Sequence, residues 1–176
     1  MDPLVEFSIP IKGIADGMHE YHYEIDGHFF EQFESSPVQQ ALIDLNVSLE
    51  KKPGLLVLHF DFTGKVNTTC DRCLADIYLP VTGSNRLLVK VSTETESEDP
   101  EVIYLHPEAT KLKFANYAYE FMILSIPIIK VYDCEAEENP PCNNELLDRL
   151  FPEEEEDEAQ ESTNPIWEEL KKFKNK

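Results

Sequence analysis

Apolar and polar residues alternate along much of the first half of this chain. The clearest run spans residues 41–49, where every second residue is apolar, and the same alternation returns over residues 56–66. A Lys-Pro-Gly turn at residues 52–54 separates the two runs. Two alternating runs across a short Pro-Gly loop are typical of an antiparallel hairpin with one buried face and one wet face. We therefore predict a long hairpin here.

Shorter patterns on the N-terminal side predict further elements. Residues 4–14 read as a first strand that ends at a glycine, and residues 18–26 place aromatic and aliphatic side chains at period two. The segment of residues 28–35 is short and suits one or two helical turns.

Beyond the long hairpin, the alternation predicts a second hairpin and an edge strand. Residues 77–81 and 87–91 alternate, and the Gly-Ser-Asn sequence at 83–85 predicts a tight turn between them. Residues 102–105 predict a short edge strand. The expected fold class is α+β, with a mainly antiparallel sheet of hairpins that could curl into a barrel.

Helical patterns occur in the second half. Residues 110–127 show helical spacing of apolar positions, with Thr110 as the expected N-cap and a proline as the stop. Residues 144–151 suit a short helix, and Asn-Pro at 164–165 opens a small amphipathic helix. We predict a β-rich domain over residues 1–150, a disordered acidic linker over 151–163, and a short C-terminal helix over 164–176.

The charge is strongly negative and unevenly distributed. The formal net charge is −20, and residues 133–161 hold thirteen acidic residues against one basic residue, Arg149. Because nucleic-acid affinity rests largely on Lys and Arg neutralising phosphates, this field disfavours duplex or long RNA as the main ligand. A basic protein partner suits the charge better, with RNA contact secondary. The alternative is that the acidic residues only keep the protein soluble.

Four cysteines are the candidate chemistry. Cys70 and Cys73 enclose a two-residue gap between predicted strands, a spacing that lets both thiolates reach one zinc ion from a tight turn. Cys134 and Cys142 would fill the two remaining tetrahedral positions, although seven residues lie between them. The five histidines show no recognised ligand spacing with the cysteines.

Two other interpretations of the cysteines stay open. A thiol-disulfide oxidoreductase would use Cys70 and Cys73, but such pairs usually open a helix, and the carboxylate of Asp71 should raise a thiol pKa. The four cysteines could also be unrelated buried residues. No nucleophile–base arrangement, phosphate loop or His-Glu-x-x-His motif occurs, so we expect no enzyme. No secretory signal pattern or membrane-length apolar run occurs either, so we expect a cytoplasmic protein.

Several of these features, in order, resemble the YceD family of large ribosomal RNA subunit accumulation proteins. Cys70, Arg72, Cys73 and Leu74 match its Cys-x-Arg-Cys-Leu segment, and "MILSIPI" at 122–128 is similar to its Leu-x-Leu-Pro motif. "NPIWEEL" at 164–170 is similar to its C-terminal segment. The likeness covers most of residues 37–176.

The resemblance implies a process rather than a reaction. It implies a non-catalytic role in the accumulation or processing of large-subunit ribosomal RNA, with zinc suspected where both cysteine pairs are present. On this basis Arg72, Trp167 and Leu170 are candidates for contact with RNA or with a protein partner. No small-molecule substrate or membrane is expected.

Overall fold

The structure is a computed structural model that describes residues 3–93, 102–134 and 138–150. The chain divides into two units, residues 1–142 and residues 143–176. The second unit contributes one described helix, α3 (Asn144–Leu150), which confirms the short helix predicted there. The predicted acidic linker and C-terminal helix, with Trp167 and Leu170, lie outside the described residues.

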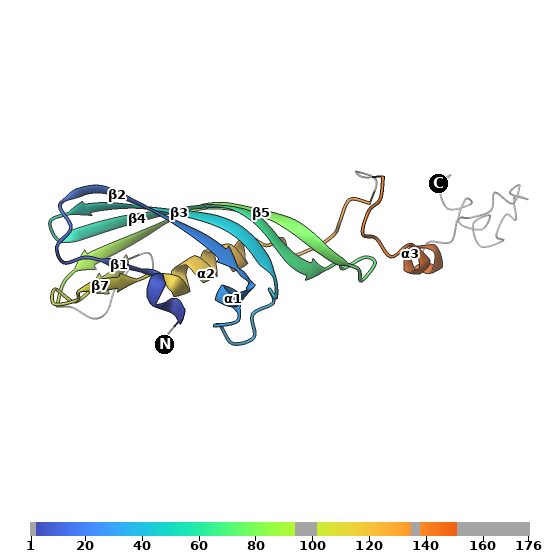
Figure 1. Cartoon of the computed structure of the whole chain (residues 1–176), viewed down its shortest axis with the longest axis horizontal. Helices are drawn as coiled ribbons and strands as arrows, with labels where there is room; N and C mark the ends of the chain where they lie inside the picture. Colours follow the sequence, from blue (N-terminus) through green and yellow to red (C-terminus); the bar gives the residue numbers. More distant parts are fainter. Residues whose placement is uncertain (1–2, 94–101, 135–137, 151–176) are drawn as a thin grey trace, which may run out of the picture. The chain divides into compact units, whose positions relative to one another are not determined.

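The first unit is built on one open five-stranded sheet. Its strand order is β2-β3-β4-β5-β6, with every neighbouring pair antiparallel except β5 and β6, which are parallel (Figure 1). The strands are β2 (Gly17–Asp26), β3 (Ala41–Lys52), β4 (Leu55–Thr69), β5 (Asp76–Val91) and β6 (Val102–Leu105). The α+β prediction is confirmed, and β2 and β6 form the edges of a sheet that does not close into a barrel.

Smaller elements lie against one face of this sheet. A two-stranded antiparallel sheet pairs β1 (Ser8–Pro10) with β7 (Lys111–Lys113). The helices in the described part of this unit are the 3₁₀ turn η1 (Pro3–Glu6), the short α1 (Gly27–Phe30) and α2 (Ala115–Leu124). Figure 1 shows α2 running along the concave face of the sheet.

The core lies between that face and α2. Alternate residues of β3 and β4 point inward and are buried, as the period-two pattern predicts. The ring of Phe60 in β4 lies 5.8 Å from that of Phe114 and 5.3 Å from that of Phe121, so aromatic contacts join sheet and helix. Each large apolar side chain buried in this way contributes about 1.5–3 kcal/mol. The hydrophobic alternation is therefore the main determinant of the sheet.

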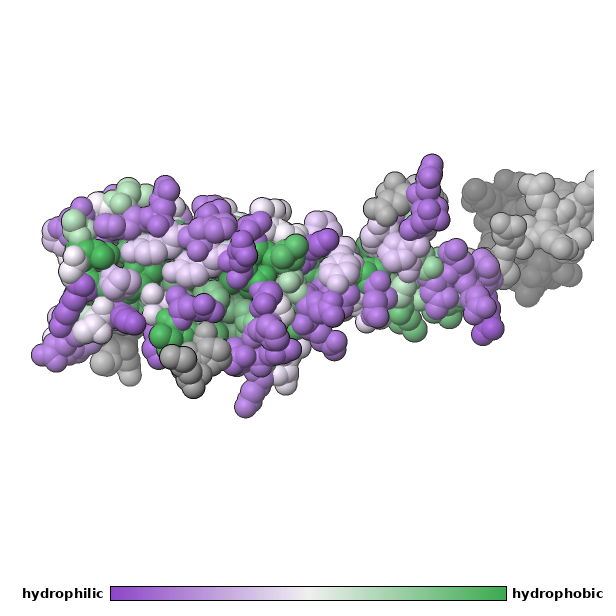
Figure 2. Space-filling view, viewed as in Figure 1, coloured by the Kyte–Doolittle hydropathy of each residue, from purple (hydrophilic) through white to green (hydrophobic). Residues whose placement is uncertain are grey.

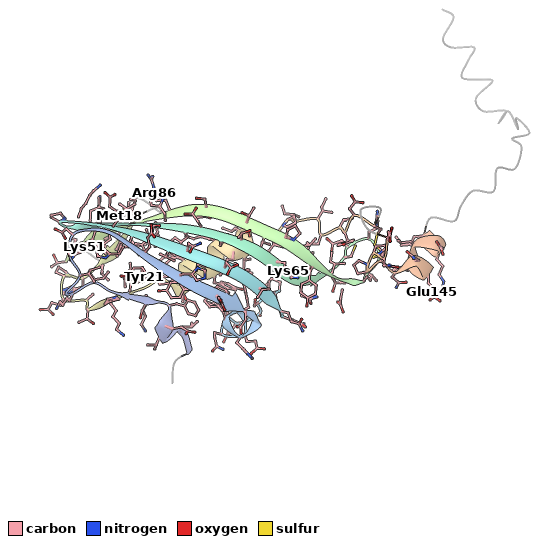
Figure 3. The ribbon with its side chains drawn as sticks, turned by 45° about the horizontal axis from the view of Figure 1, so that its top comes forward. Met18, Tyr21, Lys51, Lys65, Arg86 and Glu145 are labelled. Carbon is pink, nitrogen blue, oxygen red and sulfur yellow. A yellow bond between two sulfur atoms is a disulfide. The ribbon has the colours of Figure 1, made fainter. Side chains whose placement is uncertain are left out.

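The opposite face of the sheet is polar. The intervening residues of β2 and β3 are mostly exposed, and many are acidic. Figure 2, viewed from the side as in Figure 1, shows hydrophilic side chains over much of the surface, with apolar ones visible between them. The side chains of Met18 and Arg86 project from this outer face (Figure 3). This antiparallel sheet therefore has one face exposed to solvent and one face covered by α2 and the smaller elements, an arrangement common in such sheets.

The predicted hairpin over residues 77–91 is wrong. β5 is one continuous strand, and it pairs with β4 from Asp76 through Lys90. Gly83 lies within this strand, directly opposite Phe62. A Cβ at Gly83 would overlap the ring Cζ of Phe62 and would lie 2.8 Å from its Cε1. Glycine is therefore required here for a close approach of a ring rather than for a turn.

The predicted start of the main helix is also wrong. Thr110 is not its N-cap, because residues 111–113 form β7 and the helix begins at Ala115. The carbonyl of Thr110 instead accepts the backbone N–H of Ile11 at 2.9 Å. The C-terminal end is close to the prediction, since α2 ends at Leu124, shortly before the proline. Near the N-terminus, only residues 8–10 of the predicted first strand are extended, and α1 supplies the helical turn.

Candidate functional site

The Cys-x-x-Cys sequence forms a closed turn between β4 and β5, as predicted. β4 ends at Thr69 and β5 begins at Asp76. The N–H of Cys70 donates to the carbonyl of Ala75 at 2.8 Å, and the N–H of Leu74 donates to the carbonyl of Cys70 at 3.0 Å. Both Cys70 and Cys73 are fully buried, at 0% exposure. The turn therefore holds two thiols close together, inside the protein.

Leu74 completes this turn in an unusual backbone conformation. Its φ is 56°, in the left-handed region that glycine adopts much more easily than leucine. Its side chain is nevertheless 66% exposed, so burial of the leucine does not offset the backbone cost. The turn is therefore strained at a residue that contributes little to the core.

The sulfur of Cys70 is surrounded by hydrogen-bond donors. Burial raises the pKa of its thiol, but backbone N–H groups of Tyr132, Cys73 and Arg72, together with the Cys73 thiol, outweigh this and lower the pKa to about 7. The pKa of Cys70 is therefore lowered rather than raised, and Asp71 is not among the groups that shift it. Its carboxylate accepts the backbone N–H of Lys130 at 2.7 Å and lies 3.5 Å from the ammonium of the same residue. The lowered pKa therefore favours the thiolate form of Cys70, which is the form that metals bind.

The segment after α2 lies against the cysteine turn. The N–H of Asp71 donates to the carbonyl of Lys130 at 2.7 Å, which makes the hydrogen bonding between these two residues reciprocal. The guanidinium of Arg72 donates to the carbonyl of Tyr132 at 3.2 Å and to the sulfur of Cys134 at 2.7 Å. Thus Arg72, a candidate for RNA or partner contact, is bonded within the chain. It links Cys134 of the second pair to the turn that holds the first.

The second cysteine pair forms a disulfide. Cys134 and Cys142 are bonded to each other, with a Cα–Cα distance of 6.2 Å. Cys70 and Cys73 are free thiols. The seven-residue gap therefore lets the second pair meet, which the sequence left uncertain. A disulfide sulfur is not a thiolate, however, so all four cysteines could bind one zinc ion only after this bond is reduced.

A different group of potential ligands occurs on the outer face. Within the described ranges, His22, Glu24 and Asp44 form the group whose ligand atoms all lie within 4.8 Å of one another. All three are exposed, and Nδ1 of His22 already lies 2.9 Å from Oδ1 of Asn46. The sequence did not reveal this group, because its members come from paired strands. Exposed acidic groups of this kind are common without a metal.

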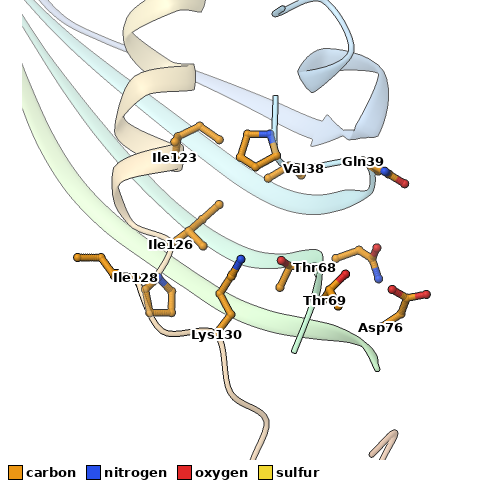
Figure 4. A pocket seen from close by; sticks show the side chains of 12 residues that line it. Val38, Gln39, Thr68, Thr69, Asp76, Ile123, Ile126, Ile128 and Lys130 are labelled. Carbon is orange, nitrogen blue, oxygen red and sulfur yellow. The ribbon is translucent and has the colours of Figure 1, made fainter. Parts of the chain in front are cut away.

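A groove lies beside the cysteine turn, and the sequence did not reveal it. Its volume is about 410 Å³, and it opens between the end of α2, the end of β4 and the segment before β3 (Figure 4). We call it the α2 groove. It is lined by Pro37, Val38, Gln39, Asn67, Thr68, Thr69, Asp76, Ile123, Ile126, Pro127, Ile128 and Lys130.

Fold and site together define an acidic α+β protein in which a Cys-x-x-Cys turn between two strands is tied to a second cysteine pair beyond the helix. Residues 58–174 match the family described as "Large ribosomal RNA subunit accumulation protein YceD", and the chain belongs to that family. The match begins in β4 and includes all four cysteines. No curated protein and no solved structure matches the chain.

The family description links this chain to the accumulation of large-subunit ribosomal RNA and names no reaction. Every helix in the described part of the chain is too short or too polar to cross a bilayer.

Proposed function

We propose that this protein is a non-catalytic factor in ribosome biogenesis that acts in the cytoplasm on the accumulation or processing of large-subunit ribosomal RNA. The observation that carries the proposal is the family match over residues 58–174, which spans the cysteine turn and α2. The net charge of −20 favours a basic ribosomal or processing protein as the main contact, with RNA secondary. Trp167 and Leu170 are proposed to contribute to partner contact.

The proposal is tested by removing the gene and measuring ribosomal RNA. Mature large-subunit RNA should fall relative to small-subunit RNA, and the wild-type gene should restore the ratio. An unchanged ratio under normal and cold growth would contradict the proposed function. A chain lacking residues 162–176 should fold normally but restore the ratio poorly, and full restoration by that chain would remove Trp167 and Leu170 from the proposal.

Structural zinc is a further part of the proposal. Cys70, Cys73, Cys134 and Cys142 would hold the ion, which would join the cysteine turn to the segment beyond α2 and contribute folding energy. Two features support the fit: the donors around the sulfur of Cys70 stabilise a thiolate, and Arg72 places Cys134 beside the turn. The Cys134–Cys142 disulfide is the competing state.

Metal analysis distinguishes the two states. Protein purified under reducing conditions without chelator should contain about one zinc per chain, the stoichiometry of a four-cysteine site. A Cys142→Ser variant should lose most of it, whereas a His22→Gln variant should keep it. Protein that contains less than about a tenth of a zinc per chain would contradict the site.

A thiol-disulfide oxidoreductase is the second candidate function. The lowered pKa of Cys70 and the neighbouring disulfide favour it. The complete burial of both Cys70 and Cys73 weighs against it, because a substrate disulfide must reach the attacking sulfur. Reduction of insulin by the metal-free dithiol form, lost in a Cys70→Ser variant, would support the enzyme. No reduction above the free-thiol background would exclude it.

A further inference from the structure

Exposed apolar side chains gather on the segment that lies against the cysteine turn. Ile128 is 97% exposed and Ile129 is 72% exposed, although both are large and aliphatic. Leu124, Val131 and Leu74 are exposed as well. Single exposed apolar residues are ordinary, but several on one continuous segment and its neighbouring turn mark an interaction surface.

This segment is held in place rather than left loose. The backbone N–H of Asp71 donates to the carbonyl of Lys130, and the backbone N–H of Lys130 donates to the carboxylate of Asp71, both at 2.7 Å. The ammonium of Lys130 also lies 3.5 Å from that carboxylate. Arg72 holds the carbonyl of Tyr132 two residues further on. The exposed isoleucines therefore lie next to firmly bonded residues. A pre-organised surface loses less entropy when a partner binds.

The α2 groove opens beside these side chains. Ile123 and Ile126 line it from α2 and its end, and Thr68 and Thr69 line it from the end of β4, while the side chain of Ile128 points outward at the rim (Figure 4). A cavity of about 410 Å³ is large enough for one or two apolar side chains of a partner. The hydroxyl groups of the two threonines provide hydrogen-bonding groups at its edge. The groove therefore suits a protruding apolar anchor with polar neighbours.

The charges of the groove indicate the kind of partner. Two charged residues line it, Asp76 and Lys130. The ammonium of Lys130 is paired with Asp71, whereas the carboxylate of Asp76 has no hydrogen bond or ion pair with any described residue. The uncompensated charge at the groove is therefore negative, in agreement with the net charge of the whole chain. A partner with Lys or Arg beside its apolar anchor would complement both features.

We propose that the α2 groove is the docking site for a basic protein segment, in which a large apolar side chain enters the groove and a neighbouring Lys or Arg pairs with Asp76. This docking site rests on the proposed function in one respect, because the basic protein partner proposed there is the one expected to bind here. Ile128 lies at the rim of the groove as an exposed apolar side chain that the bound segment would cover, and Asp76 contributes the charge.

The test uses the full chain and a defined probe. The labelled, reduced protein is applied to overlapping short peptides that cover the proteins of the large ribosomal subunit, and the tightest peptides are titrated by fluorescence polarisation. Bound peptides should be basic and should contain a large apolar residue. Ile128→Ser should weaken binding about tenfold or more, because it removes a large exposed aliphatic side chain that the bound peptide would bury. Asp76→Asn should weaken it less, and mainly at low salt.

Controls and contrary outcomes are built into the same measurement. Met18→Ser removes an apolar side chain that is 60% exposed on the outer face of the sheet, and it should leave the affinity unchanged. Equal binding by wild type and Ile128→Ser overturns the inference, and so does a preference for acidic or purely polar peptides. A concentration-dependent dimer that Ile128→Ser abolishes would identify a second copy as the occupant and also overturn it.

The inference and the proposed function fail separately. If loss of the gene lowers large-subunit RNA but Ile128→Ser binds peptides normally, the groove is wrong and the function stands. If loss of the gene leaves the RNA unchanged, the function fails whatever the peptides show.

Discussion

The guanidinium of Arg72 lies 2.7 Å from the sulfur of Cys134, although the two residues are 62 positions apart in the chain. The arginine inside the first cysteine pair therefore contacts the first member of the second pair. This contact gives the Cys-x-Arg-Cys motif a structural reason for its arginine, since a planar guanidinium can reach a carbonyl and a sulfur together.

Replacing Arg72 should loosen the segment beyond α2. An Arg72→Ala change removes two hydrogen bonds that are partly exposed, so we expect a loss of about 1 kcal/mol, or roughly 2–4 °C in Tm. Hydrogen exchange at Tyr132 and Cys134 should rise more than exchange in β4. Arg86→Ala, which removes an exposed arginine from β5, is the matched control and should change neither quantity. Unaltered exchange at Tyr132 in Arg72→Ala would show that the contact does not hold the segment.

The thiol of Cys70 should titrate at about pH 7 in the reduced, metal-free protein. The measurement is thiolate absorbance near 240 nm against pH, compared with a Cys70→Ser variant. Because the folded pKa lies below the ordinary thiol value, the unfolded state binds more protons between about pH 7 and pH 9. Stability of the reduced protein should therefore rise with pH across this window and be lost as pH falls through 7. A midpoint above 8 would contradict the arrangement of donors.

A side chain at position 83 should disrupt the pairing of β4 with β5. Gly83→Ala places a methyl group against the ring of Phe62, and overpacking of this kind costs about 1–3 kcal/mol. The double variant Gly83→Ala with Phe62→Leu should be less destabilised than the two single changes added together, because the smaller side chain makes room. Additive urea-unfolding free energies in this cycle would refute the close contact.

Glycine in place of Leu74 should stabilise the folded protein. The left-handed backbone costs a leucine about 1–2 kcal/mol, and glycine removes most of that cost at the expense of a more flexible unfolded chain. A net gain of about 0.5–1 kcal/mol is expected in Leu74→Gly, measured by urea unfolding. Leu74→Ala keeps the backbone strain and should be close to neutral, since the leucine side chain is largely exposed. A loss of stability in Leu74→Gly would show that the leucine side chain itself supports the turn.

Alternation of apolar residues was sufficient to predict most of the sheet. The hairpin of β3 and β4 follows directly from the period-two pattern, because that register buries Ile43, Leu45, Val47 and Leu49 of β3 on one face. The turn predicted at residues 83–85 is wrong because a glycine can mean either a tight turn or a place where another side chain comes very close. Only the ring of Phe62, on the neighbouring strand, shows that Gly83 is the second case. The helix start was misplaced because residues 111–113 pair with a strand about a hundred residues earlier in the chain.

The sequence by itself determined the fold class, the position of the Cys-x-x-Cys turn between two strands, and the family, because these depend on local periodicity and on short motifs. Only the tertiary structure decided what lies around the cysteines. The donor from Tyr132 to the sulfur of Cys70 and the link from Arg72 to Cys134 join segments about sixty residues apart, and the groove joins the end of α2 to the end of β4 and to the segment before β3. Such contacts depend on how β4, β5 and the end of α2 pack together, and no local pattern of residues encodes that packing.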